Sequence, residues 1–190
     1  MEKQAAAAVG QSFLMSEYSN FFEEQGVTVA QILLTRDIFL NKMSSKNAKN
    51  TILTLLNKKI VPIINENDTV AVEEIKFGDN DELSAKVAAL INSGLLIILT
   101  DTDGLHTCDP NKNKKALLIK NVKSITKNIE KLASKEPGSK GTGGMISKIK
   151  AAKDATCHGI QVFIANGREK KVIERIVSGE EVGTHFLPNK

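Results

Sequence analysis

Short apolar runs that end in polar clusters alternate along this chain with longer stretches of helical spacing. Such runs are typical of buried strands in α/β proteins, and the stretches between them indicate crossover helices. The sequence predicts strands at Val27–Thr35, Ile60–Ile64, Leu95–Thr100, Gln161–Ala165 and Gly183–Leu187, the last at an edge. It predicts helices at Met1–Glu24, Asn47–Asn57, Leu83–Asn92, Met145–His158 and Glu169–Val177. This alternation predicts an α/β fold, a three-layer αβα sandwich with a mostly parallel sheet, in one domain of 190 residues.

Two elements fit this pattern less simply. Pro62 lies inside the second predicted strand, where proline lacks the N–H that a central strand donates. The first predicted helix has an apolar face and begins at Met1, so we expect a further element of the fold to precede it.

Two polar clusters follow apolar segments in the first half of the chain. Asn65-Glu66-Asn67-Asp68 follows the run Ile60–Ile64, and Asp79-Asn80-Asp81-Glu82 follows Gly78. Because ligands bind at the carboxyl ends of strands in open α/β sheets, the two clusters could hold one small polar ligand between them. Asn, Asp and Gly also dominate ordinary turns, so the residues alone leave both interpretations open.

A third polar segment, Gly141-Thr142-Gly143-Gly144, comes directly before the helix predicted from Met145. Glycines let backbone N–H groups approach phosphate oxygens, and a helix N-terminus adds a favourable dipole. Lys148 would lie within reach of a phosphate there. The segment matches neither the Walker A nor the dinucleotide-binding pattern, so a glycine-rich loop that merely caps a helix is the alternative.

The charge pattern does not indicate a nucleic-acid interface. The net charge is +4, but the lysines concentrate between Lys112 and Lys140, and aromatic residues make up only 4% of the chain. A basic run without aromatic residues or a binding motif favours a solvated loop.

Cysteine and histidine spacing excludes several other classes. Cys108 and Cys157 show no CxxC spacing, which favours free thiols in a reducing cytoplasm over a disulfide framework or a zinc site. His106, His158 and His185 show no metal-ligand spacing and are interpreted as surface or structural residues. The chain has no apolar run long enough to span a membrane and no signal-peptide pattern.

The two polar clusters in their sequence context resemble the glutamate 5-kinases of the amino acid kinase family. The similarity lies in Ile64–Asp68, in Phe77–Ala85 and in Thr142–Lys148. Shorter matches at Ala8–Gln11, Leu33–Arg36 and Asn47-Ala48 extend the resemblance over essentially all 190 residues.

The resemblance implies the amino acid kinase fold and a phosphotransferase with a carboxyl group as acceptor. Its reaction would be ATP-dependent phosphorylation of the γ-carboxylate of L-glutamate, the first step of proline biosynthesis. Magnesium would be held mainly by the nucleotide. The family further implies a cytoplasmic homo-oligomer coupled to glutamate-5-semialdehyde dehydrogenase, with neither nucleic acid nor a membrane as partner.

Residue roles also follow from the resemblance. Lys148 would stabilise the transferring phosphoryl group and Asp81 would orient the catalytic lysines. Asp68 and Asn80 would bind glutamate, with Asn65 and Asp79 beside them. The expected nucleotide-binding residues are Thr100, Asp101, Thr142, Gly143, Gly144, Met145, Ile146, Ser147 and Lys148.

The chain departs from the family pattern in its first segment. Family members begin with a strand that carries a Lys-x-Gly-Ser/Thr phosphate motif, and a Ser-Ser/Gly-Gly-Ala-type loop follows it; neither has a match here. The expectation is an N-terminally incomplete catalytic domain without the C-terminal PUA domain of some members, and a poor or inactive kinase when the chain acts alone. One alternative is a non-catalytic remnant that binds nucleotide, glutamate or a partner subunit. A second is a kinase of the same fold for another carboxylate or a nucleotide. A third, on charge alone, is a nucleic-acid-binding module.

Overall fold

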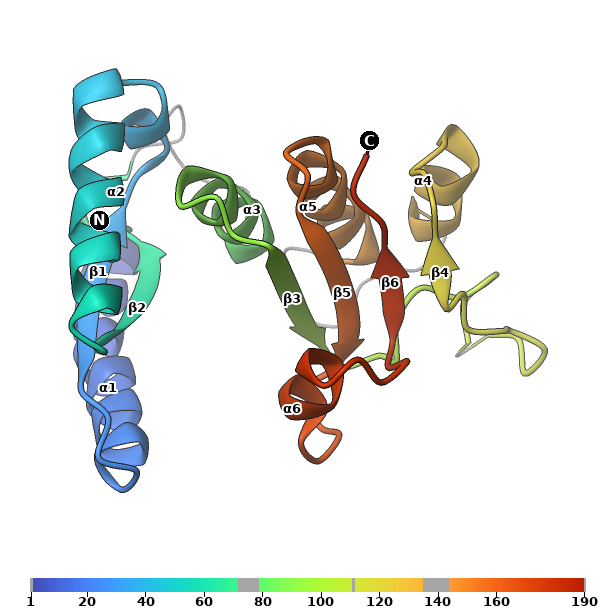
Figure 1. The fold of residues 1–190 in the computed structure, drawn as a ribbon, viewed down its shortest axis with the longest axis horizontal. Helices are drawn as coiled ribbons and strands as arrows, with labels where there is room; N and C mark the ends of the chain where they lie inside the picture. The colour runs from blue at the N-terminus through green and yellow to red at the C-terminus, as the bar shows by residue number, and fades with distance from the viewer. Residues whose placement is uncertain (1, 72–78, 111, 135–143, 190) are drawn as a thin grey trace. The chain divides into compact units, whose positions relative to one another are not determined.

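The computed structural model of the chain describes residues 2–71, 79–110, 112–134 and 144–189 (Figure 1). Its contacts divide the chain into two compact units, unit 1 (Met1–Leu83) and unit 2 (Ser84–Lys190). Each unit is described by itself.

Unit 1 is built on two parallel strands, β1 (Val29–Leu34) and β2 (Val61–Glu66). Val29 pairs with Val61 at one end of the register and Leu34 pairs with Glu66 at the other. Three helical elements accompany the strands: α1 (Glu2–Glu23), the short 3₁₀ helix η1 (Arg36–Phe39) and α2 (Lys42–Asn57). The two predicted strands and the first predicted helix are therefore confirmed, with shifts of one or two residues at their ends.

Pro62 is compatible with β2 because of the direction in which its nitrogen faces. The neighbouring Val61 N–H donates to the Thr28 carbonyl on the β1 side, at 2.9 Å. Alternate residues of a strand turn their N–H groups to opposite sides, so the nitrogen of Pro62 faces away from β1. The pairing of β1 with β2 therefore loses no hydrogen bond to the proline.

Helix α2 begins five residues before the predicted start at Asn47, because Asn41 caps it. The Asn41 side-chain oxygen accepts the backbone N–H groups of Met43 and Ser44, at 2.9 and 3.0 Å. A side-chain cap of this kind satisfies donors that have no partner within the helix. Polar residues can therefore form the first turn without an apolar stripe.

Helix α1 buries none of its side chains in the described structure. Val9, Phe13 and Phe21 are all more than half exposed. None of the described helices combines the length and the apolar character that a membrane span requires.

Unit 2 contains a four-stranded sheet in the order β3-β5-β6-β4. Its strands are β3 (Leu95–Thr100), β4 (Asn121–Val122), β5 (Gln161–Asn166) and β6 (Thr184–Phe186). Pairing is parallel between β3 and β5 and between β4 and β6, and antiparallel between β5 and β6. The prediction that the last strand lies at an edge is wrong, because the short strand β4 pairs on its outer side.

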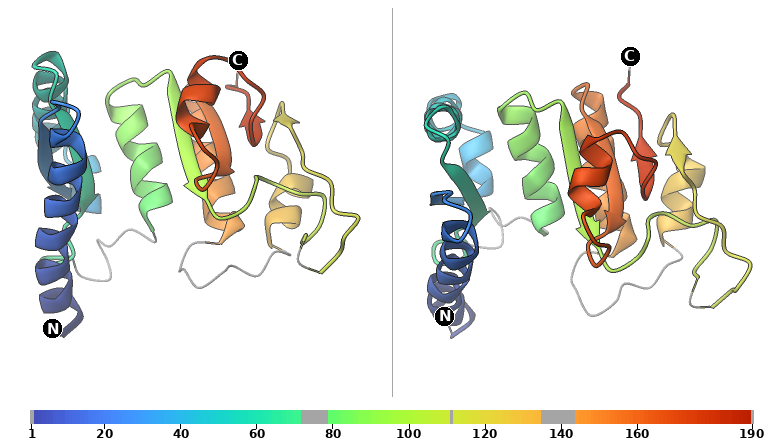
Figure 2. Two further views of the ribbon diagram at one scale, coloured as in Figure 1. Left: turned by 90° about the horizontal axis from the view of Figure 1, so that it is seen from below. Right: turned by 60° about the horizontal axis from the view of Figure 1, so that its bottom comes forward.

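The helices of unit 2 lie on both faces of this sheet. They are α3 (Asn80–Leu90, which begins in unit 1), α4 (Lys127–Ser134), α5 (Met145–Cys157) and α6 (Val172–Val177). Leu96 and Ile98 of β3 point into a core shared with α3 and α5, whereas Leu95 and Ile97 pack with α6. Figure 2 shows α5 and α6 on opposite sides of β5. Unit 2 therefore has the predicted three layers.

The interpretation of the lysine-rich segment as a loop is wrong for Lys127–Ser134, which forms α4. Ile129, Leu132 and Ala133 belong to the core on the α5 side of the sheet. Glu130 and Lys153 of α5 form a 2.7 Å ion pair, which lowers the pKa of Glu130 and raises that of Lys153. Lysines on the outer face of α4 had obscured its apolar residues.

Two further helices begin at residues other than those predicted. Helix α3 begins three residues before Leu83, because the Asp79 side chain accepts the N–H of Glu82 at 3.0 Å. Helix α6 begins three residues after Glu169. Its N-terminal boundary residue, Lys171, has a left-handed backbone with φ 57°.

We expect Gly183→Ala to destabilise unit 2 far more than Gly179→Ala. Both glycines have left-handed φ values, 67° and 89°. A methyl group at 183 would collide with the backbone of Ile164 and Ala165, whereas one at 179 meets no described atom within 4 Å. The shared backbone strain costs about 1–2 kcal/mol, and overpacking raises the Gly183 loss to about 3 kcal/mol or more. The urea unfolding midpoints of the two variants measure the loss of stability in each. Equal losses in the two variants would contradict the close packing of β5 against the turn before β6.

Candidate functional site

The polar cluster at the carboxyl end of β2 is held by a network of side-chain amides. Asn80 donates its Nδ2 hydrogen to Asn65 Oδ1 at 3.1 Å, which brings together two clusters that lie 15 residues apart in the sequence. The Asn65 oxygen also accepts the backbone N–H of Glu66, and its Nδ2 donates to Gln11 Oε1, both at 2.9 Å. Asn65 is therefore the centre of the network.

A hollow of about 230 Å³ lies beside this network, within unit 1. Asn65, Glu66 and Asp68 line one side of it, at and just beyond the end of β2. Ala7, Ala8 and Gly10 of α1 also line the hollow, and residues this small leave room in it. Two of the four residues predicted to bind substrate, Asn65 and Asp68, thus face one hollow, and Asn80 is hydrogen-bonded to its lining.

The other residues of the second cluster lie at the start of α3. Asp79 uses one carboxylate oxygen to cap the helix, which gives it a structural role. Asp81 and Glu82 occupy the first turn, where negative charge is favourable to the helix dipole. Glu82 also forms a 3.3 Å ion pair with Arg36, which follows β1. This ion pair and the contact between Asn65 and Asn80 both join the start of α3 to the strand ends.

The predicted nucleotide residues Thr100 and Asp101 lie at the carboxyl end of β3, in unit 2. Thr100 Oγ1 donates to the Asp101 carboxylate at 3.3 Å, and the Thr100 carbonyl accepts the N–H of Gly167 at 2.8 Å. Gly167 follows β5, and a methyl group there would come within 3.3 Å of Leu99 Cβ. The ends of β3 and β5 therefore form one polar edge.

The N-terminus of α5 belongs to the same edge. Helix α5 runs into β5 through a short turn and is antiparallel to it, so the helix begins near the end where β5 finishes (Figure 1). Met145, Ile146, Ser147 and Lys148 form its first turn, preceded by Gly144. Gly144 has no side chain to cap the first N–H groups, which suits an anion in that position. Thr142 and Gly143 lie outside the described residues.

No group of three or more His, Cys, Asp and Glu side chains is placed to hold a metal ion in the described ranges.

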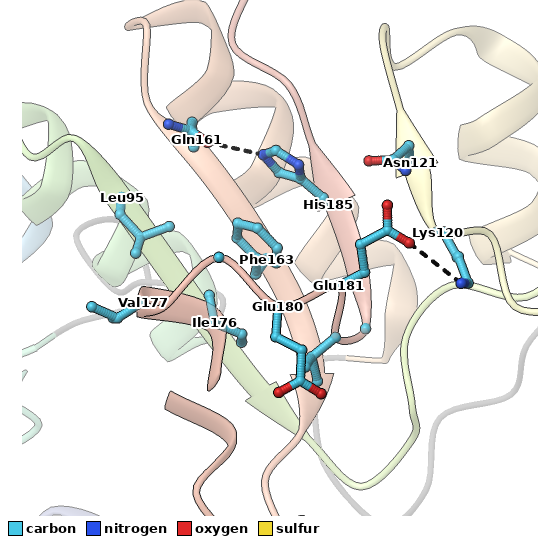
Figure 3. Close-up of a pocket in the computed structure, with 13 residues that line it drawn as sticks. Leu95, Lys120, Asn121, Gln161, Phe163, Ile176, Val177, Glu180, Glu181 and His185 are labelled. Carbon is cyan, nitrogen blue, oxygen red and sulfur yellow. Dashed lines mark hydrogen bonds and ion pairs between the residues drawn. The ribbon is translucent and has the colours of Figure 1, made fainter. Parts of the chain in front are cut away.

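A larger hollow, of about 400 Å³, lies on the α6 side of the sheet in unit 2 (Figure 3). Leu95, Phe163 and Ile176 supply its apolar lining. Its charged lining consists of Lys120, Glu180 and Glu181, and Lys120 pairs with Glu181 at 3.4 Å. Carboxylates outnumber ammonium groups there, so this hollow is unsuited to a triphosphate.

The His185 ring lies flat against Phe163 in this second hollow, with 4.2 Å between ring centres and 8° between planes (Figure 3). Burial lowers the pKa of His185 below its ordinary value of 6.5. As the pH falls through 6.5, the unfolded chain therefore takes up a proton that the folded protein resists, and stability decreases. The neighbouring Glu180 stays charged while His185 titrates, because its hydrogen bonds with Arg175 lower the pKa of Glu180.

We expect the thermal midpoint of the chain to fall between pH 7 and pH 5.5, and to fall less in His185→Phe. Phenylalanine keeps an aromatic ring against Phe163 and has no titrating group. Thermal unfolding at several pH values compares the two slopes. Parallel slopes would show that His185 does not carry this pH dependence.

The sequence analysis missed Gln11 as a site residue. It lies on α1 and accepts the Asn65 amide, 54 residues away in the sequence. One signal was present: Gln11 shares a helix face with Ala7, Ala8 and Leu14, so an amide lies on a stripe of small and apolar residues.

Comparison with known proteins shows a match at both the family and the fold level. The family model described as the amino acid kinase family matches residues 1–166. The chain is 51% identical to glutamate 5-kinase of Clostridium tetani, over 97% of this chain and 69% of the relative. It is 47% identical to glutamate 5-kinase of Clostridium perfringens, over 100% of this chain and 72% of the relative. In glutamate 5-kinase of Moorella thermoacetica, which is 50% identical, it covers half of the relative's length.

Solved structures show the same fold at low sequence identity. An isopentenyl phosphate kinase matches with a TM-score of 0.64 and 19% identity, over 92% of this chain and 66% of that one. A carbamate kinase from Giardia lamblia bound to AMP-PNP matches with a TM-score of 0.54 and 22% identity, over 74% of this chain and 44% of that one. These likenesses confirm the predicted fold class.

The fold and the polar strand ends are those of a kinase of the amino acid kinase type. The chain belongs to the amino acid kinase family and, within it, to the glutamate 5-kinases. The resemblance drawn from the sequence motifs is confirmed.

Proposed function

We propose that this protein transfers the γ-phosphoryl group of ATP to the γ-carboxylate of L-glutamate, with residues 1–190 acting as one catalytic domain. The product, γ-glutamyl phosphate, would enter proline biosynthesis in the cytoplasm. The observation that carries the proposal is the hydrogen bond between Asn65 and Asn80, because it joins the two motifs that distinguish glutamate 5-kinases in the sequence.

The hollow of unit 1 supports the glutamate end of this proposal. Glutamate carries an ammonium group and two carboxylates, so its site needs both acceptors and donors. Asp68 and the Asn80 side-chain oxygen would accept from the ammonium group, and the Asn65 network would hold them in place. Asp79 caps α3 and would act mainly by fixing the start of that helix.

The polar edge of unit 2 supports the nucleotide end. Thr100 and Asp101 would contact the nucleotide, and Gly144, Met145 and Ile146 would present N–H groups to its phosphates. Lys148 would stabilise the transferring phosphoryl group and Asp81 would orient the lysine. Magnesium would be bound through the phosphates, where it neutralises their charge. Thr142 and Gly143, which lie outside the described residues, are proposed as further phosphate contacts.

The test is ATP-dependent formation of glutamyl hydroxamate in the presence of hydroxylamine. We expect glutamate to be a better substrate than aspartate or acetylglutamate. A preference for aspartate or acetylglutamate would overturn the assignment of Asp68 and Asn80. ATP binding without any product would favour the non-catalytic alternative.

A homo-oligomer is also proposed from the family resemblance, together with coupling to glutamate-5-semialdehyde dehydrogenase. The coupling fits a product as reactive as an acyl phosphate, which hydrolyses unless it is passed on. Light scattering at several protein concentrations measures the oligomeric state.

A further inference from the structure

We propose that Gln11 is a positioning residue for the glutamate site, which holds the Asn65 amide in one orientation and thereby sets the direction of Asn80. The inference rests on the function proposed above. Its basis is the hydrogen-bond network at the end of β2, in which each amide group has a defined donor side and acceptor side.

The Glu66 backbone N–H and the Gln11 side chain together hold the orientation of Asn65. The Glu66 N–H can only donate, and it lies 2.9 Å from Asn65 Oδ1. The side-chain oxygen of Asn65 must therefore be on that side, and its Nδ2 must be on the other. There it donates to Gln11 Oε1, also at 2.9 Å.

The same orientation decides which atom Asn80 offers to a ligand. Asn65 Oδ1 accepts the Asn80 Nδ2 hydrogen at 3.1 Å, so the Asn80 oxygen points away from Asn65. If the Asn65 amide turned over, its nitrogen would face two donors, the Glu66 N–H and the Asn80 Nδ2. Asn80 would then rotate to present its oxygen to Asn65, and it would lose the acceptor that an ammonium group needs.

The Gln11 amide is itself oriented by a hydrogen bond to Gln31. Its Nε2 lies 3.4 Å from Gln31 Oε1 of β1, which leaves Oε1 directed at Asn65. Four amides, from α1, β1, β2 and the start of α3, thus form one directional chain: Gln31, Gln11, Asn65 and Asn80. Gln11 is partly buried and lines the hollow, so its oxygen accepts from Asn65 where competition from water is reduced.

The test replaces Gln11 by methionine, which has a similar length and flexibility but no strong acceptor. We expect the KM for glutamate to rise about tenfold, the typical effect of one lost hydrogen bond. The KM for ATP and the turnover number should stay within about twofold. Gln4→Met is the matched control, because Gln4 lies on the same helix and donates to the Ala71 carbonyl at 3.3 Å. It should leave the KM for glutamate unchanged.

Two results would overturn the inference while leaving the proposed function intact: an unchanged KM for glutamate in Gln11→Met, or an equal rise in Gln4→Met. A rise in KM for both substrates together with a lower thermal midpoint would show a merely structural role. If Gln11→Met does not fold, Gln11→Ala removes the same acceptor with a residue of high helix propensity and is expected to behave in the same way. An unsubstituted protein without glutamate-dependent activity would instead refute the proposed function.

Discussion

Replacing Lys148 by methionine is expected to lower the turnover number about 10²- to 10³-fold, with the KM for glutamate changed no more than a few-fold. Lys148 lies in the first turn of α5, beside the proposed phosphate loop. A charge contact made mainly in the transition state is worth roughly this factor in rate. Steady-state kinetics with glutamate and ATP varied separately measure the two constants.

Lys150→Met is the matched control for this change, because Lys150 lies on the same helix and is exposed. It should stay within about twofold of the unsubstituted protein. A loss of glutamate affinity in Lys148→Met with unchanged turnover would place this lysine at the substrate end instead of the phosphate end.

Replacing Asn80 by alanine is expected to raise the KM for glutamate by about 10- to 100-fold. The substitution removes the proposed acceptor for the ammonium group, and a hydrogen bond to a charged group contributes about 1.5–3 kcal/mol. The effect on the KM for ATP should be small, since Asn80 contacts Asn65 at the end of β2. The same assay measures both constants.

Asn50→Ala controls for the loss of an amide from a helix in unit 1, because Asn50 is an exposed residue of α2. Its kinetic constants should match those of the unsubstituted protein. If Asn80→Ala lowered turnover and left both KM values unchanged, Asn80 would belong to the chemical step and not to substrate binding.

The strands were the most predictable part of the fold. The run Leu95–Thr100 appears as β3 with the same bounds, because a continuous apolar segment between polar residues is typical of a buried strand. The start of α2 was not predictable from periodicity, because it depends on the Asn41 cap and on polar residues. Helix α4 was missed because lysines surround the few apolar residues that it buries.

Residues of the candidate site that belong to a sequence motif could be predicted. A residue that joins the site only through a tertiary contact could not. Asn65 and Asn80 lie in polar clusters that follow apolar segments, and the structure joins them through a hydrogen bond. The participation of Gln11 depends on how α1 packs against β1 and β2, which local sequence does not specify. Asp79 lies in the second cluster, and the structure adds that its carboxylate caps α3, a contact that the motif alone did not indicate.

The most direct test of the central claim, that unit 1 binds glutamate and unit 2 binds the nucleotide, is an NMR titration of ¹⁵N-labelled protein that is active in the hydroxamate assay. We predict that L-glutamate shifts the side-chain amide signals of Asn65 and Asn80, and that ADP shifts the backbone amide signals of Met145 to Lys148. Glutamate that shifted the α5 signals and left those of Asn65 and Asn80 unchanged would contradict the account.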